Sequence, residues 1–147
     1  MKVLIQRVLS SSVRLIKDGK IKEEVSIGKG LLLFVGIGKN DDEDKASFLA
    51  QKIFTLRIFE NKGKFDLSLR DIKGEVLVVP QFTLYGDAEK GRRPDFTSAE
   101  RPERAKKLFD FFCEEMSKYV LCKKGFFGEK MEVELINDGP VTLMVEK

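Results

Sequence analysis

Histidine and tryptophan are absent from the 147-residue sequence, and cysteine occurs only at positions 113 and 122. Without histidine the chain can form no Ser-His-Asp triad, no Cys-His pair and no HExxH zinc site. Two thiolates are too few for a four-cysteine metal site. Proton transfers in any reaction must therefore use carboxylates, hydroxyls, backbone groups, water or the substrate itself. We expect no metal and no organic cofactor, so EDTA should leave any activity intact.

Long hydrophobic runs are also lacking. No apolar stretch approaches the roughly 20 residues that cross a bilayer, and residues 1–7 become polar too soon for a signal peptide. We therefore expect a cytoplasmic protein without a membrane partner. In that setting Cys113 and Cys122 are expected to be reduced, partly buried thiols, with a disulfide or redox pair as the alternative. The net charge of +3 suits contacts with a few phosphates but not a protein that coats nucleic acid.

The length and a hydrophobic content of 42% predict one domain spanning residues 1–147. Residues 3–25 alternate as strands do, with a hairpin signal at Asp18-Gly19. Residues 31–37 are apolar on both faces, which is typical of a buried central strand. Further strands are expected at residues 55–60, 76–79, 132–136 and 141–145, the last two joined by a turn at 137–140.

Apolar residues recur at helical spacing in two places. One follows the acidic segment 40–44, which suits the positive end of a helix dipole. The other follows Pro102, at a position where a first helical residue tolerates proline. The sequence therefore predicts an α/β fold: a single mixed, mostly antiparallel sheet or partial β-barrel with two longer helices packed on one side.

A polar pair, Gln81 and Thr83, follows the apolar run at 76–79. The plain interpretation is a strand end with a polar cap. The functional interpretation is that these groups position water or an ester carbonyl, since ligands collect where loops leave a rigid scaffold. Backbone N–H groups of this loop could then stabilise the oxyanion of an acyl transfer.

The segment Asn137-Asp138-Gly139-Pro140 has the residues that hairpin turns favour. The alternative is a cis Gly139-Pro140 bond, for which the general frequency is about 5–6%. Such a bond would redirect both flanking carbonyls, and two fixed carbonyls facing a pocket could accept hydrogen bonds from a substrate ammonium group.

Two loops complete the set of candidate motifs. In the segment 125–131, glycines allow close approach to a ligand, and Phe127 and Met131 could line an apolar pocket. The basic segment at 90–94 is either a solvated loop or a phosphate-contacting loop, because arginine matches phosphate geometry. Its candidate residues are Lys90, Arg92 and Arg93.

In this order, the motifs resemble the D-aminoacyl-tRNA deacylase family over essentially the whole chain. The matching segments are Gln6-Arg7-Val8, Gln81-Phe82-Thr83-Leu84, Gly91-Arg92-Arg93-Pro94, Phe127-Gly128 and Asn137-Asp138-Gly139-Pro140-Val141-Thr142. The resemblance implies hydrolysis of D-aminoacyl-tRNA and mischarged glycyl-tRNA, with L-amino acids rejected by Gly139-Pro140. It also implies a homodimer with active sites at the subunit interface, an aminoacylated tRNA 3′ end as partner, and no DNA partner.

The resemblance assigns roles residue by residue. Thr83 and Gln81 would be catalytic, and the basic loop would contact tRNA. Substrate-binding roles would fall to Phe82, Gly139, Pro140, Asn137, Met131, Phe127 and Arg7. The family usually has serine directly before Gln-Phe-Thr, where this chain has Pro80. That departure keeps two alternatives open: a non-catalytic RNA-binding dimer on the same fold, or a related deacylase with a different ester preference.

Overall fold

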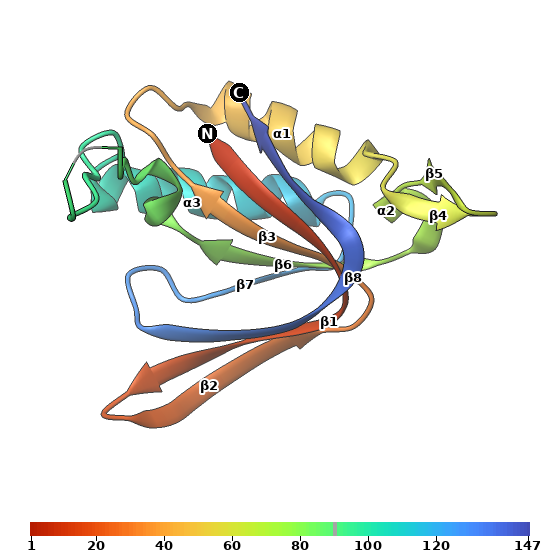
Figure 1. Cartoon of the computed structure of the whole chain (residues 1–147), viewed down its shortest axis with the longest axis horizontal. Helices are drawn as coiled ribbons and strands as arrows, with labels where there is room; N and C mark the ends of the chain where they lie inside the picture. Colours follow the sequence, from red (N-terminus) through yellow and green to blue (C-terminus); the bar gives the residue numbers. More distant parts are fainter. Residues whose placement is uncertain (90) are drawn as a thin grey trace.

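A strongly curved sheet forms the body of the protein, and helices cover one of its sides (Figure 1). The computed structural model describes residues 1–89 and 91–147. The sheet has six strands in the order β2-β1-β3-β6-β7, with β8 paired to β1. Their bounds are β1 (Lys2–Lys17), β2 (Lys20–Ile27), β3 (Gly30–Gly36), β6 (Glu75–Pro80), β7 (Cys122–Lys124) and β8 (Met131–Glu146).

Strand β1 organises the sheet because it pairs antiparallel with three neighbours, β2, β3 and β8. The remaining pairs, β3 with β6 and β6 with β7, are parallel. The sheet is therefore mixed and mostly antiparallel, and it curves into a barrel-like shape (Figure 1). This confirms the predicted fold class.

The β1–β2 hairpin turns at Asp18 and Gly19, as the sequence predicts. Both residues have positive φ, 53° and 68°, which is the conformation of the tight turn that suits twisted antiparallel strands. Strand β3 is buried on both faces: Leu31 and Leu33 pack in the core beneath the helices, and Leu32 packs in the cluster on the opposite face.

Two long helices, α1 (Glu43–Thr55) and α3 (Pro102–Ser117), pack together on one side of the sheet (Figure 1). The Asp42 carboxylate caps α1 by accepting a hydrogen bond from the Lys45 N–H at 2.9 Å, and Pro102 begins α3. Between them lie β4 (Phe59–Asn61), β5 (Lys64–Leu67), the short α2 (Leu69–Ile72) and the 3-10 turn η1 (Phe82–Tyr85). Within the described residues, no helix is long and apolar enough to cross a bilayer.

Two expectations about strands are wrong. The strand expected at 55–60 is shorter and begins later: helix α1 continues to Thr55, and β4 covers Phe59–Asn61. A short apolar run does not by itself distinguish a helix from a strand. The expected turn at 137–140 is also absent, because β8 runs continuously through it. Its pairing with β1 shifts register near Val8 instead, so turn-type residues here form an irregularity within one long strand.

Both cysteines are free thiols, as expected, with Cys113 buried and Cys122 half-buried. The contact between the two thiols raises the pKa of Cys113, and burial raises that pKa further. The same contact lowers the pKa of Cys122. They lie on α3 and β7, respectively.

Candidate active site

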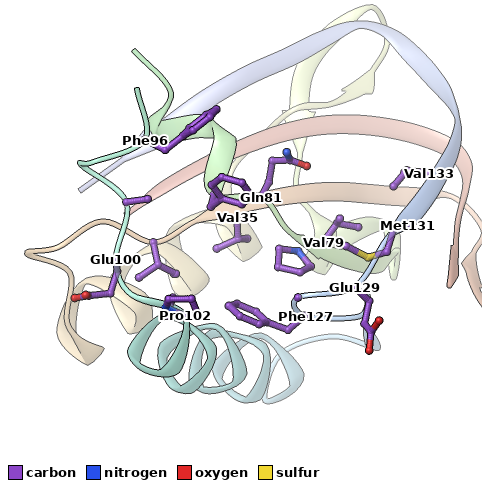
Figure 2. Close-up of a pocket in the computed structure, with 16 residues that line it drawn as sticks. Val35, Val79, Gln81, Phe96, Glu100, Pro102, Phe127, Glu129, Met131 and Val133 are labelled. Atoms are coloured by element: carbon purple, nitrogen blue, oxygen red, sulfur yellow. The ribbon is translucent and has the colours of Figure 1, made fainter. Parts of the chain in front are cut away.

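A cavity of about 620 Å³ opens where β3 and β6 end. These strands are parallel, and Val35 pairs with Pro80, so both strands end at the same edge of the sheet. The cavity wall is mostly apolar (Figure 2). Its lining residues are Val35, Ile37, Val79, Pro80, Gln81, Phe82, Phe96, Ala99, Glu100, Pro102, Ala105, Phe127, Gly128, Glu129, Met131 and Val133.

The polar pair predicted from the sequence lies at this edge. The N–H of Gln81 donates to the carbonyl of Val35 at 2.8 Å, which continues the β6 pairing by one residue before η1 begins. The Gln81 side-chain amide donates to the hydroxyl of Thr83. Gln81 lines the cavity, and the exposed Thr83 is joined to it through this contact.

Phe82 projects at the rim with 59% of its surface exposed. Its ring meets that of Phe96 edge to face, with centroids 5.2 Å apart. Phe96 comes from the segment before α3 and is itself 36% exposed. No periodic pattern pointed to Phe96, because it lies in a stretch of sequence that is typical of a loop.

The segment after β7 forms the opposite wall, where the sequence predicted Phe127 and Met131. Phe127 packs against Phe109 of α3 at a centroid distance of 5.8 Å. The Met131 sulfur accepts a hydrogen bond from the Phe126 N–H at 3.3 Å. A Cβ atom on Gly125 would lie 3.2 Å from this sulfur, so the absence of a side chain at Gly125 allows the close packing.

Glu100 and Glu129 also line this cavity, and neither was predicted; their carboxylates point away from its centre (Figure 2). The Arg101 N–H donates to Glu100 at 2.7 Å, and the Arg104 guanidinium pairs with it. These contacts, the backbone one first, lower the pKa of Glu100. In the described part of the chain, no cluster of three or more Cys, Asp or Glu side chains could hold a metal ion.

The Gly139-Pro140 segment does not line the cavity of its own chain. Its peptide bond is cis, and both residues are exposed. The Asn137 side chain donates to the carbonyls of Arg7 at 2.9 Å and Val141 at 3.1 Å. Asn137 thereby ties the irregular part of β8 to β1.

Arg7 is 3% exposed and holds the same segment. Its guanidinium donates to the carbonyls of Asp138 at 3.1 Å, Gly139 at 3.2 Å and Ile58 at 2.6 Å. It also pairs with the Asp138 carboxylate at 3.0 Å. The structure thus brings Arg7 and Asn137 together with Gly139-Pro140, apart from the residues that line the cavity.

The basic loop extends beyond a short bridge in which Asp87 and Asp95 exchange two backbone hydrogen bonds of 2.8 Å. Arg92 and Arg93 are exposed in this loop. Lys90, the third predicted residue, lies outside the described residues. Because Phe96 directly follows the bridge, the loop leaves the fold close to the aromatic rim of the cavity.

Known proteins match this chain in sequence and in fold. A family model described as D-Tyr-tRNA(Tyr) deacylase matches residues 4–146. The chain belongs to this deacylase family. Two curated relatives, the D-aminoacyl-tRNA deacylases of Thermosipho melanesiensis and Bacillus cytotoxicus, are each 49% identical to it. Those matches cover 99% of this chain and 97% and 99% of the relatives. This membership confirms the resemblance and makes the chain a hydrolase of the D-aminoacyl-tRNA deacylase class.

Solved structures of similar proteins agree with the deacylase fold. The c-Myc DNA Unwinding Element Binding Protein has a TM-score of 0.89 and 37% identity, and the match covers 100% of this chain and 99% of that one. A probable eukaryotic D-amino acid tRNA deacylase has a TM-score of 0.82 and covers 98% and 97% of the two chains. At 17% identity, that second likeness shows the fold alone.

Proposed function

We propose that this deacylase hydrolyses the ester bond between a D-amino acid and the 3′ end of tRNA and acts as a chiral proofreading enzyme in the cytoplasm. Water adds to the ester carbonyl, the carbon–oxygen bond to the ribose breaks, and the ribose oxygen takes a proton. The observation that carries the proposal is the hydrogen-bonded Gln81-Thr83 pair beside an apolar cavity at the ends of two parallel strands. The names of the two curated relatives support the substrate class.

The chemistry requires no histidine. An aminoacyl ester is activated by its own ammonium group and by a neighbouring ribose hydroxyl, so positioning and oxyanion stabilisation supply most of the catalysis. Phe82 and Thr83 begin η1, and the first N–H groups of a helix lack partners within it. We assign these N–H groups to the oxyanion. Thr83, oriented by Gln81, positions the terminal ribose or water, and the ribose 2′-hydroxyl assists.

The chirality of the substrate is tested by Gly139-Pro140 of a second subunit. Both residues are exposed and lie away from the cavity of their own chain, so a homodimer is needed to bring them to an active site. At a stereocentre held by its ammonium and ester groups, a main-chain wall would clash with an L side chain. Glycine has no side chain to clash, so glycyl-tRNA is accepted.

The rim and the basic loop receive the RNA. Aromatic faces stack on bases, and Phe82 and Phe96 present such faces at the mouth of the cavity. Phe127 and Met131 provide an apolar wall for the terminal nucleoside. Arg92 and Arg93 are placed to contact phosphates of the acceptor end, and Lys90 belongs to the same proposed loop.

Hydrolysis of D-tyrosyl-tRNA and L-tyrosyl-tRNA at equal enzyme concentration tests this function, with Thr83→Ala and Pro140→Ala alongside. We expect rapid loss of only the D ester in the unaltered protein. Thr83→Ala should slow the reaction, and Pro140→Ala should lower the preference for D over L. Glycyl-tRNA should be cleaved faster than L-alanyl-tRNA; equal resistance of both would contradict the proposed selection.

A second candidate function is a non-catalytic RNA-binding dimer, and Pro80 is the observation that favours it. Pro80 lines the cavity at the position where the family usually has serine, and it supplies neither a hydroxyl nor a backbone N–H there. Such a protein would bind tRNA with salt-dependent affinity but release no amino acid. A related deacylase with another ester preference would instead cleave L or glycyl esters faster than D esters.

A further inference from the structure

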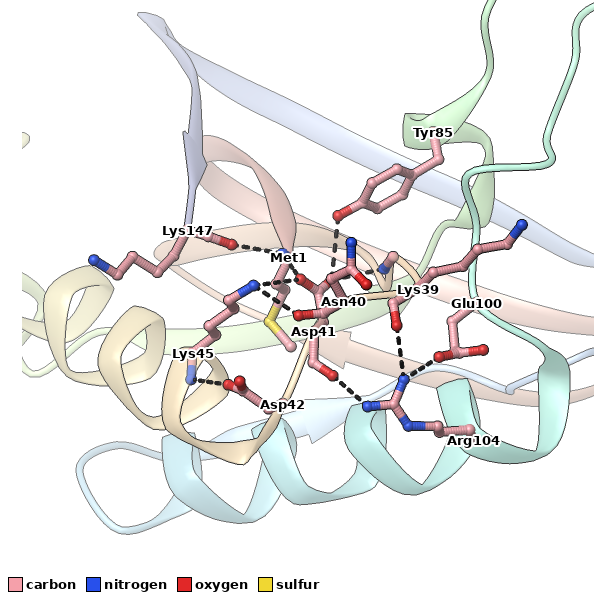
Figure 3. Close-up of polar contacts among 11 residues, drawn as sticks. Met1, Lys39, Asn40, Asp41, Asp42, Lys45, Tyr85, Glu100, Arg104 and Lys147 are labelled. Carbon is pink, nitrogen blue, oxygen red and sulfur yellow. Dashed lines mark hydrogen bonds and ion pairs between the residues drawn. The ribbon is translucent and has the colours of Figure 1, made fainter.

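A polar cluster around one buried carboxylate lies behind the 3-10 turn and takes no part in the chemistry described above (Figure 3). Its centre is the carboxylate of Asp41, which is 4% exposed. One oxygen accepts hydrogen bonds from the Gly38 N–H at 2.6 Å and from the Tyr85 hydroxyl at 3.2 Å. The other oxygen pairs with the ammonium group of Met1. We call Gly38, Asp41, Tyr85, Glu100 and Arg104 the Asp41 cluster.

One arm of the cluster reaches the catalytic turn, because Tyr85 is the last residue of η1. The Tyr85 ring lies so close to Gly38 that a Cβ atom there would come within 2.6 Å of it. The Lys2 ammonium lies 4.8 Å from the ring centroid. Burial, followed by the charge and hydrogen bond of Asp41, raises the pKa of Tyr85, so its hydroxyl stays a donor.

The other arm reaches the opposite side of the cavity. The Arg104 guanidinium donates to the backbone carbonyls of Asp41 at 2.6 Å and Lys39 at 3.0 Å, and it also pairs with the carboxylate of Glu100 (Figure 3). Glu100 lines the cavity, and its N–H donates to the Ile37 carbonyl at 2.9 Å. The segment 37–41 therefore contacts both walls, one through Tyr85 and one through Glu100 and Arg104.

We infer that the hydrogen bond from Tyr85 to Asp41 is a positioning contact for deacylation, which fixes the turn carrying Thr83 relative to the α3 wall. The inference rests on the proposed function. No side chain caps the start of η1, where the Gln81 N–H bonds the Val35 carbonyl at 2.8 Å and Phe82 packs on Phe96. At the end of η1, the Tyr85 hydroxyl bonds the Asp41 carboxylate. Release of that end would let the exposed Thr83 lose alignment, and small misplacements of a catalytic group are costly to the rate.

Tyr85→Phe tests the contact, because it removes only the hydroxyl and keeps the ring on Gly38. With D-tyrosyl-tRNA we expect kcat to fall about tenfold with KM within about twofold, the pattern of an interaction that matters in the transition state. The matched control is Tyr119→Phe. Tyr119 is the other tyrosine of the chain, and it stacks on Phe54 with centroids 5.0 Å apart. Its kcat should equal that of the unaltered protein.

A double variant separates positioning from a general loss of structure. If Tyr85 acts through the turn that holds Thr83, then Tyr85→Phe should change single-turnover rates by less than about twofold when Thr83→Ala is already present. An equal fall in both backgrounds would overturn the inference, as would an unchanged kcat in Tyr85→Phe. Thermal unfolding shows whether Tyr85→Phe is still folded. A loss of rate caused by unfolding of this variant would also overturn the inference. An unaltered protein that releases no D-tyrosine refutes the proposed function itself.

Discussion

The turn that follows β6 and the Gly139-Pro140 segment of β8 are built in opposite ways. The turn presents side chains, Gln81, Phe82 and Thr83, beside the cavity of its own chain. The Gly139-Pro140 segment presents backbone, is clamped by Arg7, and lies away from that cavity. In the proposed function, the reaction rate depends on the turn within one chain, and selection depends on a backbone surface that one subunit offers to the other.

The largest effect on stability and selectivity should come from removing the Arg7 clamp, the set of guanidinium hydrogen bonds that holds Gly139-Pro140. Arg7→Met keeps the side-chain length but removes every hydrogen bond to Asp138, Gly139 and Ile58. We expect the free energy of unfolding, measured in urea, to fall by about 3 kcal/mol, because hydrogen bonds from a buried charged group are lost and the carbonyls that accepted them are left without a donor. The preference for D over L esters should also fall, because the Gly139-Pro140 backbone is no longer fixed.

Arg14→Met is the matched control, since Arg14 lies on the same strand and pairs with Glu24 at 3.3 Å and Glu134 at 3.2 Å near the surface. Such pairs contribute about 0–1 kcal/mol, so this variant should change stability little and selectivity not at all. Equal selectivity in Arg7→Met and the unaltered protein would show that the clamp does not serve selection.

A smaller effect is expected when η1 is displaced by a side chain added behind Tyr85. Gly38→Ala places a Cβ atom where the Tyr85 ring lies, 2.6 Å from its nearest atom. Overpacking of this kind costs about 1–3 kcal/mol of stability, and the displaced turn should cleave D-tyrosyl-tRNA and glycyl-tRNA more slowly by the same factor. Initial rates on the two esters measure this.

Gly28→Ala serves as the control for Gly38→Ala, because a Cβ atom at Gly28 meets nothing within 4 Å. Its rates on both esters should equal those of the unaltered protein. A Gly38→Ala variant that lost selectivity but kept its rate would reverse the assignment of rate to the turn and of selection to Gly139-Pro140.

Local patterns allowed much of the scaffold to be predicted from the sequence. The Asp18-Gly19 hairpin, the doubly buried β3 and the starts of α1 and α3 each depend on residues within about one turn or one strand pair. The irregularity in β8 was mistaken for a turn because Asn, Asp, Gly and Pro suit both. What distinguishes them is the pairing of residues 137 and 142 with β1, which no local pattern encodes.

The residues of the candidate site could be predicted only where they belong to a recognisable sequence motif. Gln81, Phe82, Phe127 and Met131 were expected near a pocket and line one. Phe96 and Glu100 were missed, because they sit in a loop and reach the cavity only through contacts made in the folded chain. The Arg7 clamp likewise joins residues 51 to 132 positions apart in the sequence.

The smallest of these effects should come from Asn137→Ala. This change removes two side-chain hydrogen bonds, to the carbonyls of Arg7 and Val141, but leaves the Arg7 guanidinium in place. Since a typical hydrogen bond contributes about 0.5–1.5 kcal/mol and Asn137 is exposed, we expect urea unfolding to show a loss of about 1 kcal/mol. The preference for D over L esters should fall less than in Arg7→Met.

Asn61→Ala is the control for the loss of a surface amide, because the Asn61 side chain donates to the exposed Asp66 carboxylate at 3.3 Å. It should alter neither stability nor selectivity measurably. If Asn137→Ala behaved like Asn61→Ala, the guanidinium alone would be sufficient to hold the Gly139-Pro140 backbone. If it instead matched Arg7→Met, the two contacts would act as one unit, in which loss of either releases the segment. If the contacts of Arg7 and Asn137 act separately, the losses of stability and selectivity in Asn137→Ala should lie between those of Asn61→Ala and Arg7→Met.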